Sequence, residues 1–320
     1  MGTFAKNLTM TPIITRISLI FLSLLIGLSS CRKVEKDAVS EDKQDITQKA
    51  DPKPLTKSFK DYWYAGEAEI TSYELEQARY GQIHPGKAVL IFVTEPFNPD
   101  KQVKADQSSP TNVSVLKLNA TKNFLTGIYP YSVMSSTFYP VGDNQHAIKV
   151  TSSIQEWCGQ VFAQLNNRDQ FEIRSFSYFE SEGDQDLQLD KAPLENEIWT
   201  QIRIRPESLP TGEISMIPSF EYLRLMHKPV MAYRAEARLE QDQGNNTYIL
   251  TYPELKRELV IRFSETFPYS IESWEETYPS GFGPSTEVLT TKARKIKSLK
   301  TPYWRQNGNE DVSLRDTLGI

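Results

Sequence analysis

Cysteine and histidine are scarce in this sequence of 320 residues, which contains two cysteines and three histidines. Cys31 and Cys158 alone cannot build a disulfide framework, so stability must come from buried apolar surface. His84, His146 and His227 stand far apart without cysteine partners, which excludes the common zinc motifs. The sequence also lacks a phosphate-binding glycine loop and a Gly-x-Ser-x-Gly motif. These absences predict no metal site and no cofactor.

Positive charge is not in excess either. The chain holds 36 Lys and Arg residues against 41 Asp and Glu residues, a formal net charge of −5. Nucleic-acid binding depends on a basic surface that neutralises phosphates, so we expect no nucleic-acid partner. A hydrophobic content of 39% with 11% aromatic residues is enough for a globular core.

Long apolar runs are absent except near the N-terminus. After Lys6 and Arg16, residues 17–30 form an apolar run that is too short for the ~20 residues needed to span a bilayer. Positive residues followed by such a run are typical of a signal peptide. The run ends in LSSC at residues 28–31, which resembles the lipobox of bacterial lipoproteins. A single transmembrane anchor and ordinary signal cleavage are the alternatives.

The lipobox resemblance implies a lipid-anchored protein. Residues 1–30 would be the signal peptide, the Cys31 thiol would carry diacylglycerol, and the new amino terminus would be acylated. The membrane is then a partner of the chain through this lipid. Arg32 and Lys33 follow the cysteine instead of an aspartate. By resemblance to lipoprotein sorting, this favours the outer membrane, with the domain in the periplasm.

The mature chain divides into three parts. Residues 31–58 carry charges of both signs and no aromatic residue, which predicts a disordered tether behind the lipidated cysteine. Residues 59–310 hold the apolar patterns of a folded domain. Residues 311–320 show no usable pattern and predict a flexible tail.

Alternating apolar and polar residues predict strands through most of the domain. The clearest is 231–240, where Tyr233, Ala235 and Ala237 share one face. The polar turn at 242–246 predicts a hairpin to a strand at 247–252. Further strands are predicted at 87–94, 148–154, 171–180 and 259–263.

One segment has a helical period. Leu194, Ile198 and Ile202 repeat every four residues after Pro193, which predicts a helix of about ten residues. The fold class is therefore mostly β: a large antiparallel, curved or partly closed (half-barrel-like) sheet with one covering helix.

Cys158 has two interpretations. Trp157, Val161 and Phe162 surround it in a strand-like pattern, which favours a small buried side chain, and Gly159 suggests a β-bulge. The alternative is a thiolate nucleophile activated by a histidine.

Charged segments offer further candidates. Residues 180–190 are acidic and could wrap calcium, although their spacing does not match an EF-hand, so a solvated loop is favoured. Residues 292–300 are basic and fit an anionic surface or, preferably, a protected sheet edge. Glu74 and Glu76 could form an acid/base pair, but at this spacing on a strand they simply share a wet face.

Three segments carry a resemblance to a known family: 62–81 (YWYAGEAEITSYELEQARYG), 155–159 (QEWCG) and 177–184 (SYFESEGD). They resemble a family of uncharacterised Gram-negative lipoproteins, some of whose members are labelled "septum formation inhibitor Maf". Genuine Maf proteins are cytoplasmic α/β pyrophosphatases that open with a Ser-Pro-Arg-Arg type motif, which this sequence lacks. The resemblance therefore implies a localisation rather than a reaction, and Cys31 is the residue that it assigns.

The predicted function is that of a membrane-anchored envelope lipoprotein, a non-catalytic binding or scaffolding module for a lipid, glycan or envelope protein. The alternative is an envelope hydrolase or transferase with Cys158 as nucleophile. We expect a concave sheet face or cavity to carry the binding. Its candidate ligand contacts are aromatic: Trp157, Phe176, Tyr178, Tyr233 and Trp274.

Overall fold

A computed structural model describes residues 54–142, 146–242 and 244–320. They fall within one compact unit, Lys49–Ile320. The predicted signal peptide, Cys31 and most of the predicted tether lie outside the described residues.

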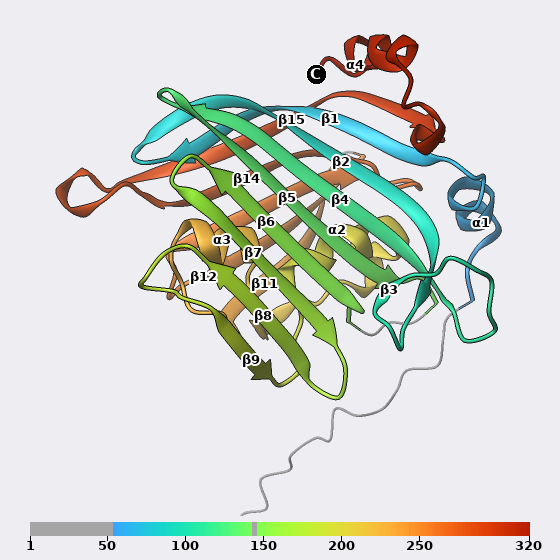
Figure 1. The fold of residues 1–320 in the computed structure, drawn as a ribbon, viewed down its shortest axis with the longest axis horizontal. Coiled ribbons are helices and arrows are strands. Elements are labelled where there is room, and N and C mark those ends of the chain that lie inside the picture. The colour runs from blue at the N-terminus through green and yellow to red at the C-terminus, as the bar shows by residue number, and fades with distance from the viewer. Residues whose placement is uncertain (1–53, 143–145, 243) are drawn as a thin grey trace, which may run out of the picture. The chain divides into compact units, whose positions relative to one another are not determined.

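The described residues form one 15-stranded sheet whose strand pairs are all antiparallel, as the sequence predicts (Figure 1). The strands are β1 (Ala68–Arg79), β2 (Gln82–Asn98), β3 (Val103–Lys104), β4 (Val113–Thr126), β5 (Tyr129–Pro140), β6 (Lys149–Glu156), β7 (Gly159–Asn167), β8 (Phe171–Ser177), β9 (Gln185–Leu189), β10 (Gly212–Met216), β11 (Tyr233–Asp242), β12 (Asn245–Tyr252), β13 (Arg257–Ser264), β14 (Ile271–Ser280) and β15 (Glu287–Thr301).

The sheet is a meander joined at one seam. Its order is β10-β11-β12-β13-β14-β15-β1-β2-β4-β5-β6-β7-β8-β9, with the short β3 beside β2. Apart from β3–β4 and β9–β10, strands that follow each other along the chain are neighbours, and the last strand, β15, pairs with the first, β1. The edges β9 and β10 do not pair with each other, so the sheet, which is curved in Figure 1, is not closed into a barrel. Just beyond them, Leu194 and Ile217 make a single parallel bridge.

Four α-helices accompany the sheet in the described residues: α1 (Lys57–Trp63), α2 (Glu195–Ile204), α3 (Phe220–Leu225) and α4 (Ser313–Leu318). The predicted helix after Pro193 is α2, which packs on β4 and β5, while α3 packs on β6. The start of α2 is fixed by Glu197, whose carboxylate accepts hydrogen bonds from the N–H groups of Leu194 (3.1 Å) and Ala147 (2.7 Å). Short 3₁₀ turns complete the described chain at Pro206–Ser208, Gly283–Ser285, Tyr303–Arg305 and Asn309–Val312.

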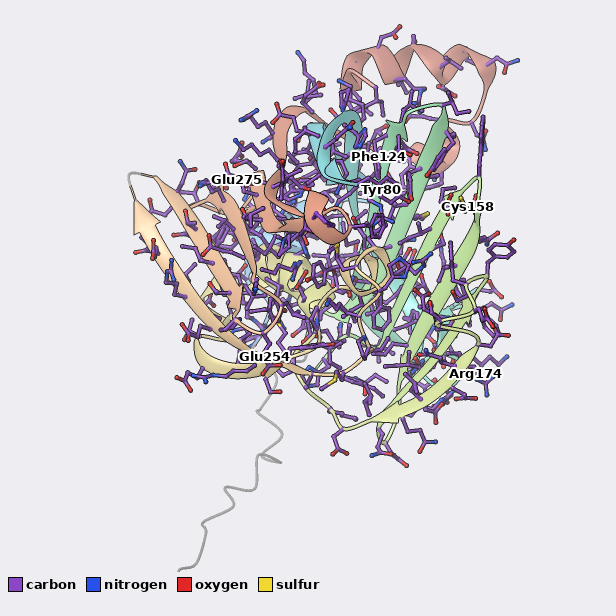
Figure 2. All side chains as sticks on the ribbon, turned by 90° about the vertical axis from the view of Figure 1, so that its left-hand side faces the viewer. Tyr80, Phe124, Cys158, Arg174, Glu254 and Glu275 are labelled. Atoms are coloured by element: carbon purple, nitrogen blue, oxygen red, sulfur yellow. The ribbon has the colours of Figure 1, made fainter. Side chains whose placement is uncertain are left out.

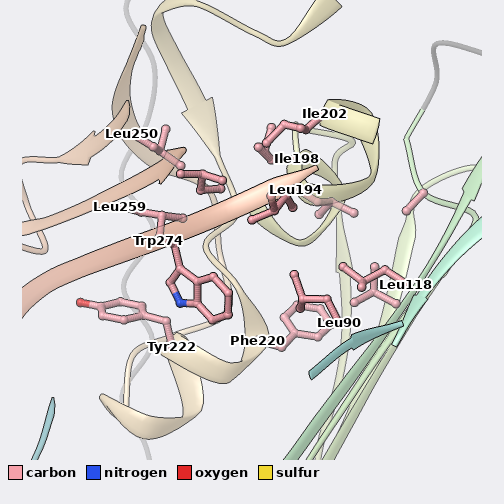
Figure 3. Packing of buried hydrophobic residues seen from close by; sticks show 14 of the residues in the cluster. Leu90, Leu118, Leu194, Ile198, Ile202, Phe220, Tyr222, Leu250, Leu259 and Trp274 are labelled. Atoms are coloured by element: carbon pink, nitrogen blue, oxygen red, sulfur yellow. The ribbon is translucent and has the colours of Figure 1, made fainter. Parts of the chain in front are cut away.

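Helices and side chains fill the interior of the curved sheet. Figure 3 shows Ile198 and Ile202 of α2 between Leu250 and Leu259 on one part of the sheet and Leu118 on the other. The strands supply this core by alternation, and β13 is the clearest case because every second residue is buried. On β11 the predicted face is confirmed at Tyr233, Ala235 and Ala237.

Three sequence predictions are corrected. Residues 311–320 are not a patternless flexible tail, because α4 packs on β15, with Leu318 buried and its carbonyl oxygen accepting from the Ser72 hydroxyl. Gly159 is not a bulge: it is the first residue of β7, in regular register with Glu156. The predicted sheet edge at 292–300 is wrong only for 292–294, which pair with both β14 and β1, because residues 295 and 297–300 pair with β1 alone.

Candidate functional site

A buried charge cluster lies between α2 and the sheet. Arg257 of β13 donates to both carboxylate oxygens of Glu195, at 2.5 and 2.6 Å, and through Nε to Glu276 at 2.7 Å. The hydroxyl of Tyr252 also donates to Glu195, at 2.9 Å. Burial alone would raise the pKa of Glu195, but the charge and hydrogen bonds of Arg257 outweigh it and hold that pKa below its usual value. Both partners are thus satisfied within the protein.

A second buried pair joins the other end of α2 to β1. Arg203 donates to both oxygens of Glu69, at 2.7 and 2.6 Å, and through Nε to the carbonyl of Pro268. Tyr62 also donates to Glu69. Burial and the neighbouring Glu69 carboxylate raise the pKa of Tyr62 well above its usual value. This pair is structural, because its hydrogen-bonding groups face each other and not open space.

A cavity of about 60 Å³ lies beside the first cluster, with room for a few water molecules. Trp199 and Trp274 form part of its wall, with their rings edge to face at 5.3 Å. Lys122 and Glu221 form an ion pair of 2.7 Å across it. An acyl chain needs several times this volume, so this cavity does not serve as the lipid-binding interior expected from the sequence.

The five predicted ligand contacts do not share one face. Tyr233 and Trp274 are buried inside the sheet, at 8% and 2% exposure, and only Trp274 lines the cavity. Trp157, Phe176 and Tyr178 are exposed on the outside. Alternation along each strand was visible in the sequence, but which face would turn inward was not fixed for the short strands around these residues.

Cys158 is exposed, so the prediction of a buried thiol is wrong. It lies in the two-residue turn between β6 and β7, where its N–H donates to Glu156 at 2.7 Å. A hydrogen bond with Glu156 and the charge of that carboxylate raise the pKa of the Cys158 thiol, the opposite of what a nucleophile requires.

The three histidines contact other groups. His84 bonds the carbonyl of Arg79 at 3.1 Å, and His146 bonds Glu197 at 2.9 Å. His227 bonds Glu182 at 2.7 Å. Each imidazole therefore has a ring nitrogen engaged away from Cys158.

The charged segments have separate partners. In 180–190, Glu182 pairs with Arg224 and Asp186 pairs with Arg174. Among the described residues no group of three or more His, Cys, Asp or Glu side chains is placed to hold a metal ion. Glu74 and Glu76 lie on the wet face, paired with Lys87 and Arg294 respectively.

Exposed apolar side chains gather at one end of the sheet. Antiparallel strands turn alternately at two ends, and the β1–β2, β4–β5, β6–β7, β8–β9 and β14–β15 turns fall at the same end, here called the hairpin end. Of the eight large apolar side chains more than half exposed in the described chain, six lie here. We call these six the hairpin-end rim: Leu125, Ile128, Trp157, Tyr178, Phe282 and Val288.

Figure 2 looks onto the hairpin end, with Tyr80 and Cys158 in view. Ile128, at the β4–β5 turn, is 83% exposed. The Trp157 ring stacks on Tyr129 with centroids 6.3 Å apart. A Cβ at Gly159 would come within 2.7 Å of Tyr178, so the absence of a side chain there makes room for this ring. The rim thus extends over neighbouring hairpins.

A cluster of Arg79, Tyr80 and Tyr131 stabilises the β1–β2 turn at the hairpin end. Tyr80 adopts φ 52° and Gly81 φ 74° in the two-residue β1–β2 turn, a left-handed conformation that a tyrosine seldom adopts. The Tyr80 hydroxyl lies 2.7 Å from that of Tyr131, and the Arg79 guanidinium lies 4.3 Å from the Tyr80 ring centre. Arg79 also donates to the carbonyl of Leu225 at 2.5 Å. These contacts fix the turn in place.

Of the six rim residues, sequence analysis identified Trp157 and Tyr178 as candidate contacts and missed the other four. The available indication was an apolar residue beside a turn glycine, in Gly127-Ile128 and Phe282-Gly283. No helix of the described residues is long and apolar enough to cross a membrane.

Comparisons with known proteins do not assign this chain to a family. No protein-family model and no curated protein matches the chain. Among solved structures, a porin-like protein from Bacteroides uniformis is 9% identical, with 71% of this chain and 95% of that chain covered and a TM-score of 0.21. At that TM-score the similarity assigns neither fold nor function to this chain.

Proposed function

We propose that this protein is a lipid-anchored envelope lipoprotein of the outer membrane whose β-domain is a non-catalytic binding or scaffolding module in the periplasm. Its partner is a lipid, a glycan or an envelope protein. The contact surface is the hairpin-end rim and not the interior of the sheet.

The location of the solvent-exposed apolar side chains supports this proposal. The interior is occupied by α2, α3 and the buried charge clusters, and the cavity beside them is about 60 Å³. Large apolar side chains that stay in water are concentrated at the hairpin end. Clustered exposed apolar groups mark interaction sites in soluble domains.

The anchor and the tether support the proposal from the sequence. The lipobox ends at Cys31, and a charged segment without aromatic residues joins it to the domain. A nucleophilic role for Cys158 is not supported, since the hydrogen bond and charge of Glu156 raise the pKa of its thiol and each histidine contacts another group.

The anchor is tested by metabolic labelling with an alkyne fatty acid in the native host. The wild-type chain should take up the label and fractionate with outer membranes, while Cys31→Ser should remain an unlabelled, uncut precursor. Equal labelling of both chains would reject the anchor.

The contact surface is tested by photo-crosslinking. In the mature protein the Cys31 thiol would be blocked by lipid, so a benzophenone maleimide would react at Cys158 alone. The control carries Cys158→Ser with Trp304→Cys, which moves the probe to an exposed position after β15 at the other end of the sheet. Crosslinks to membrane components should form from Cys158 and not from position 304. Absence of any crosslink from Cys158 would reject the rim as the contact surface.

A further inference from the structure

We infer that the hairpin-end rim inserts into the interfacial layer of a lipid bilayer, the same membrane that holds the acyl chains of Cys31. This inference rests on the proposed function and narrows its partner to one chemistry.

The shape of the rim fits a fluid partner. Ile128, Trp157 and Phe282 stand on three different hairpins, each as a protruding side chain. Charged residues stand next to them in the chain, such as Glu156 directly before Trp157. A protein partner needs a continuous complementary surface of roughly 800 Å² on each side. Separate tips can enter a bilayer independently, because lipids rearrange around each of them.

The residue types match the depth profile of a membrane interface. The most exposed tip, Ile128 at 83%, is aliphatic and suits the upper acyl region. Trp157 and Tyr178 combine an apolar ring with a polar group, and such side chains concentrate at the headgroup level. An aromatic-only surface with polar partners would suit a glycan better, and Leu125, Ile128 and Val288 do not fit that pattern.

Charge does not drive this contact. Nearby on β1 and β2, Lys87 pairs with Glu74 at 2.6 Å, so its charge is already balanced. Arg79 is buried against tyrosine rings. Insertion should therefore occur on zwitterionic lipids and change little with salt concentration.

The tether is long enough for the rim to reach the membrane. The α1 helix lies at the end opposite the rim, where the Thr94 hydroxyl of β2 donates to the carbonyl of Trp63 (Figure 1). The 14 residues of β4 cover roughly 46 Å. About 25 residues between Cys31 and α1 span up to roughly 85 Å when extended. Because the anchor keeps the domain close to the bilayer, weak insertion by a few tips is sufficient.

The test uses the mature acylated protein in phosphatidylcholine–phosphatidylethanolamine vesicles. A polarity-sensitive nitrobenzoxadiazole probe on Cys158 reports the environment beside Trp157, and the same probe at position 304 in the Cys158→Ser, Trp304→Cys control reports the opposite end. Interfacial groups lie about 5–10 Å into the headgroup–acyl boundary. We expect a blue shift and quenching by shallow nitroxide lipids at position 158, unchanged by added salt, and neither effect at position 304.

Two variants test whether the signal of the probe at Cys158 depends on insertion of the rim side chains or only on the closeness of the anchored domain to the bilayer. Ile128→Ser with Trp157→Ser should abolish the blue shift and the quenching at Cys158 while the protein stays anchored. Trp304→Ser should leave both intact. Since Ile128, Trp157 and Trp304 are exposed, circular dichroism should show an unchanged fold in both variants.

The inference is overturned if the probe at Cys158 remains solvent-exposed on vesicles. Should crosslinks from Cys158 then form to an envelope protein or a glycan, the proposed binding module stands and only the bilayer is rejected. If neither lipid nor any other component reaches Cys158, the proposed function fails with it.

Discussion

Arg257 and Glu195 face each other across the interior with two parallel hydrogen bonds, and their side chains are 1% and 2% exposed. The pair connects the first turn of α2 to β13. Glu276 accepts a further hydrogen bond from the Nε of Arg257. Burial therefore keeps both groups paired with each other and away from bulk water.

Removal of one partner should therefore be costly. Arg257→Met is expected to lower the free energy of unfolding by about 3–5 kcal/mol, since it leaves a buried carboxylate without its partner. Urea unfolding provides the measurement. Arg238→Met is the control, because the Arg238–Glu240 pair is more than half exposed and should change the free energy by less than about 0.5 kcal/mol. Similar losses in the two variants would contradict a stabilising role for the interior pair.

The Glu69–Arg203 pair predicts a loss of stability in acid. Burial would raise the pKa of Glu69, but the Arg203 charge and hydrogen bonds outweigh it and hold that pKa below its usual value. The stability contributed by the carboxylate is therefore complete above its unfolded pKa of about 4.3 and is lost as the pH falls through the lower folded pKa. Urea unfolding of wild type and Glu69→Gln should differ most at neutral pH and converge below that range. A constant difference from neutral pH to about pH 3 would contradict this.

Cys158 should react in the native state but slowly. An aromatic disulfide reagent is expected to modify the Cys158 thiol of the folded protein, because the side chain is exposed. Glu156→Gln removes the hydrogen bond and charge that raise the thiol pKa, so the rate near neutral pH should increase roughly two- to tenfold. A thiol that reacts only after unfolding would show that the turn is covered in solution.

Gly159 is needed for the packing of Tyr178. A Cβ at this position would lie 2.7 Å from the Tyr178 ring, so Gly159→Ala should displace the ring and destabilise the protein by about 1 kcal/mol. Gly142→Ala is the matched control, since its Cβ would meet no atom within 4 Å. Thermal unfolding should separate the two variants, and an equal effect would show that the Tyr178 ring is not held at Gly159.

The C-terminal helix should contribute to stability. Leu318 of α4 is buried at 6% exposure, and Leu318→Ala should lower the free energy of unfolding by about 2 kcal/mol. Val312→Ala, at a 60% exposed position, should have no measurable effect. A neutral Leu318→Ala would mean that the helix does not pack on β15 in solution.

The large sheet and α2 were predictable because both depend on periodicity. The alternation at 231–240 and the four-residue repeat from Leu194 to Ile202 are local patterns that the fold retains. The position of the 292–300 segment was predictable only in part. Lysines suit an edge, and residues 295 and 297–300 pair on one side only, whereas the pairing of 292–294 with both β14 and β1 depends on distant parts of the chain.

The site was harder to predict than the fold. Tyr178 and Trp274 look alike in sequence, because both stand among aromatic and polar residues, yet one faces water and the other the core. The buried partners Glu69 and Arg203 are 134 positions apart. Neither short-range pattern nor spacing reveals such a pair.

The seam between β1 and β15 constrains how the protein is made. Thr71 and Ser298 hydrogen-bond across it although they are 227 positions apart, whereas most neighbouring strands are connected by short turns. Joining such distant segments costs chain entropy before their contacts are gained, so this step is slow. The hairpins on either side can form as the chain emerges, but the fold is complete only when the last strand is present. A chain truncated before β15 would consequently expose both unpaired edges of the seam to other chains, so completion of the whole polypeptide becomes a condition for its solubility.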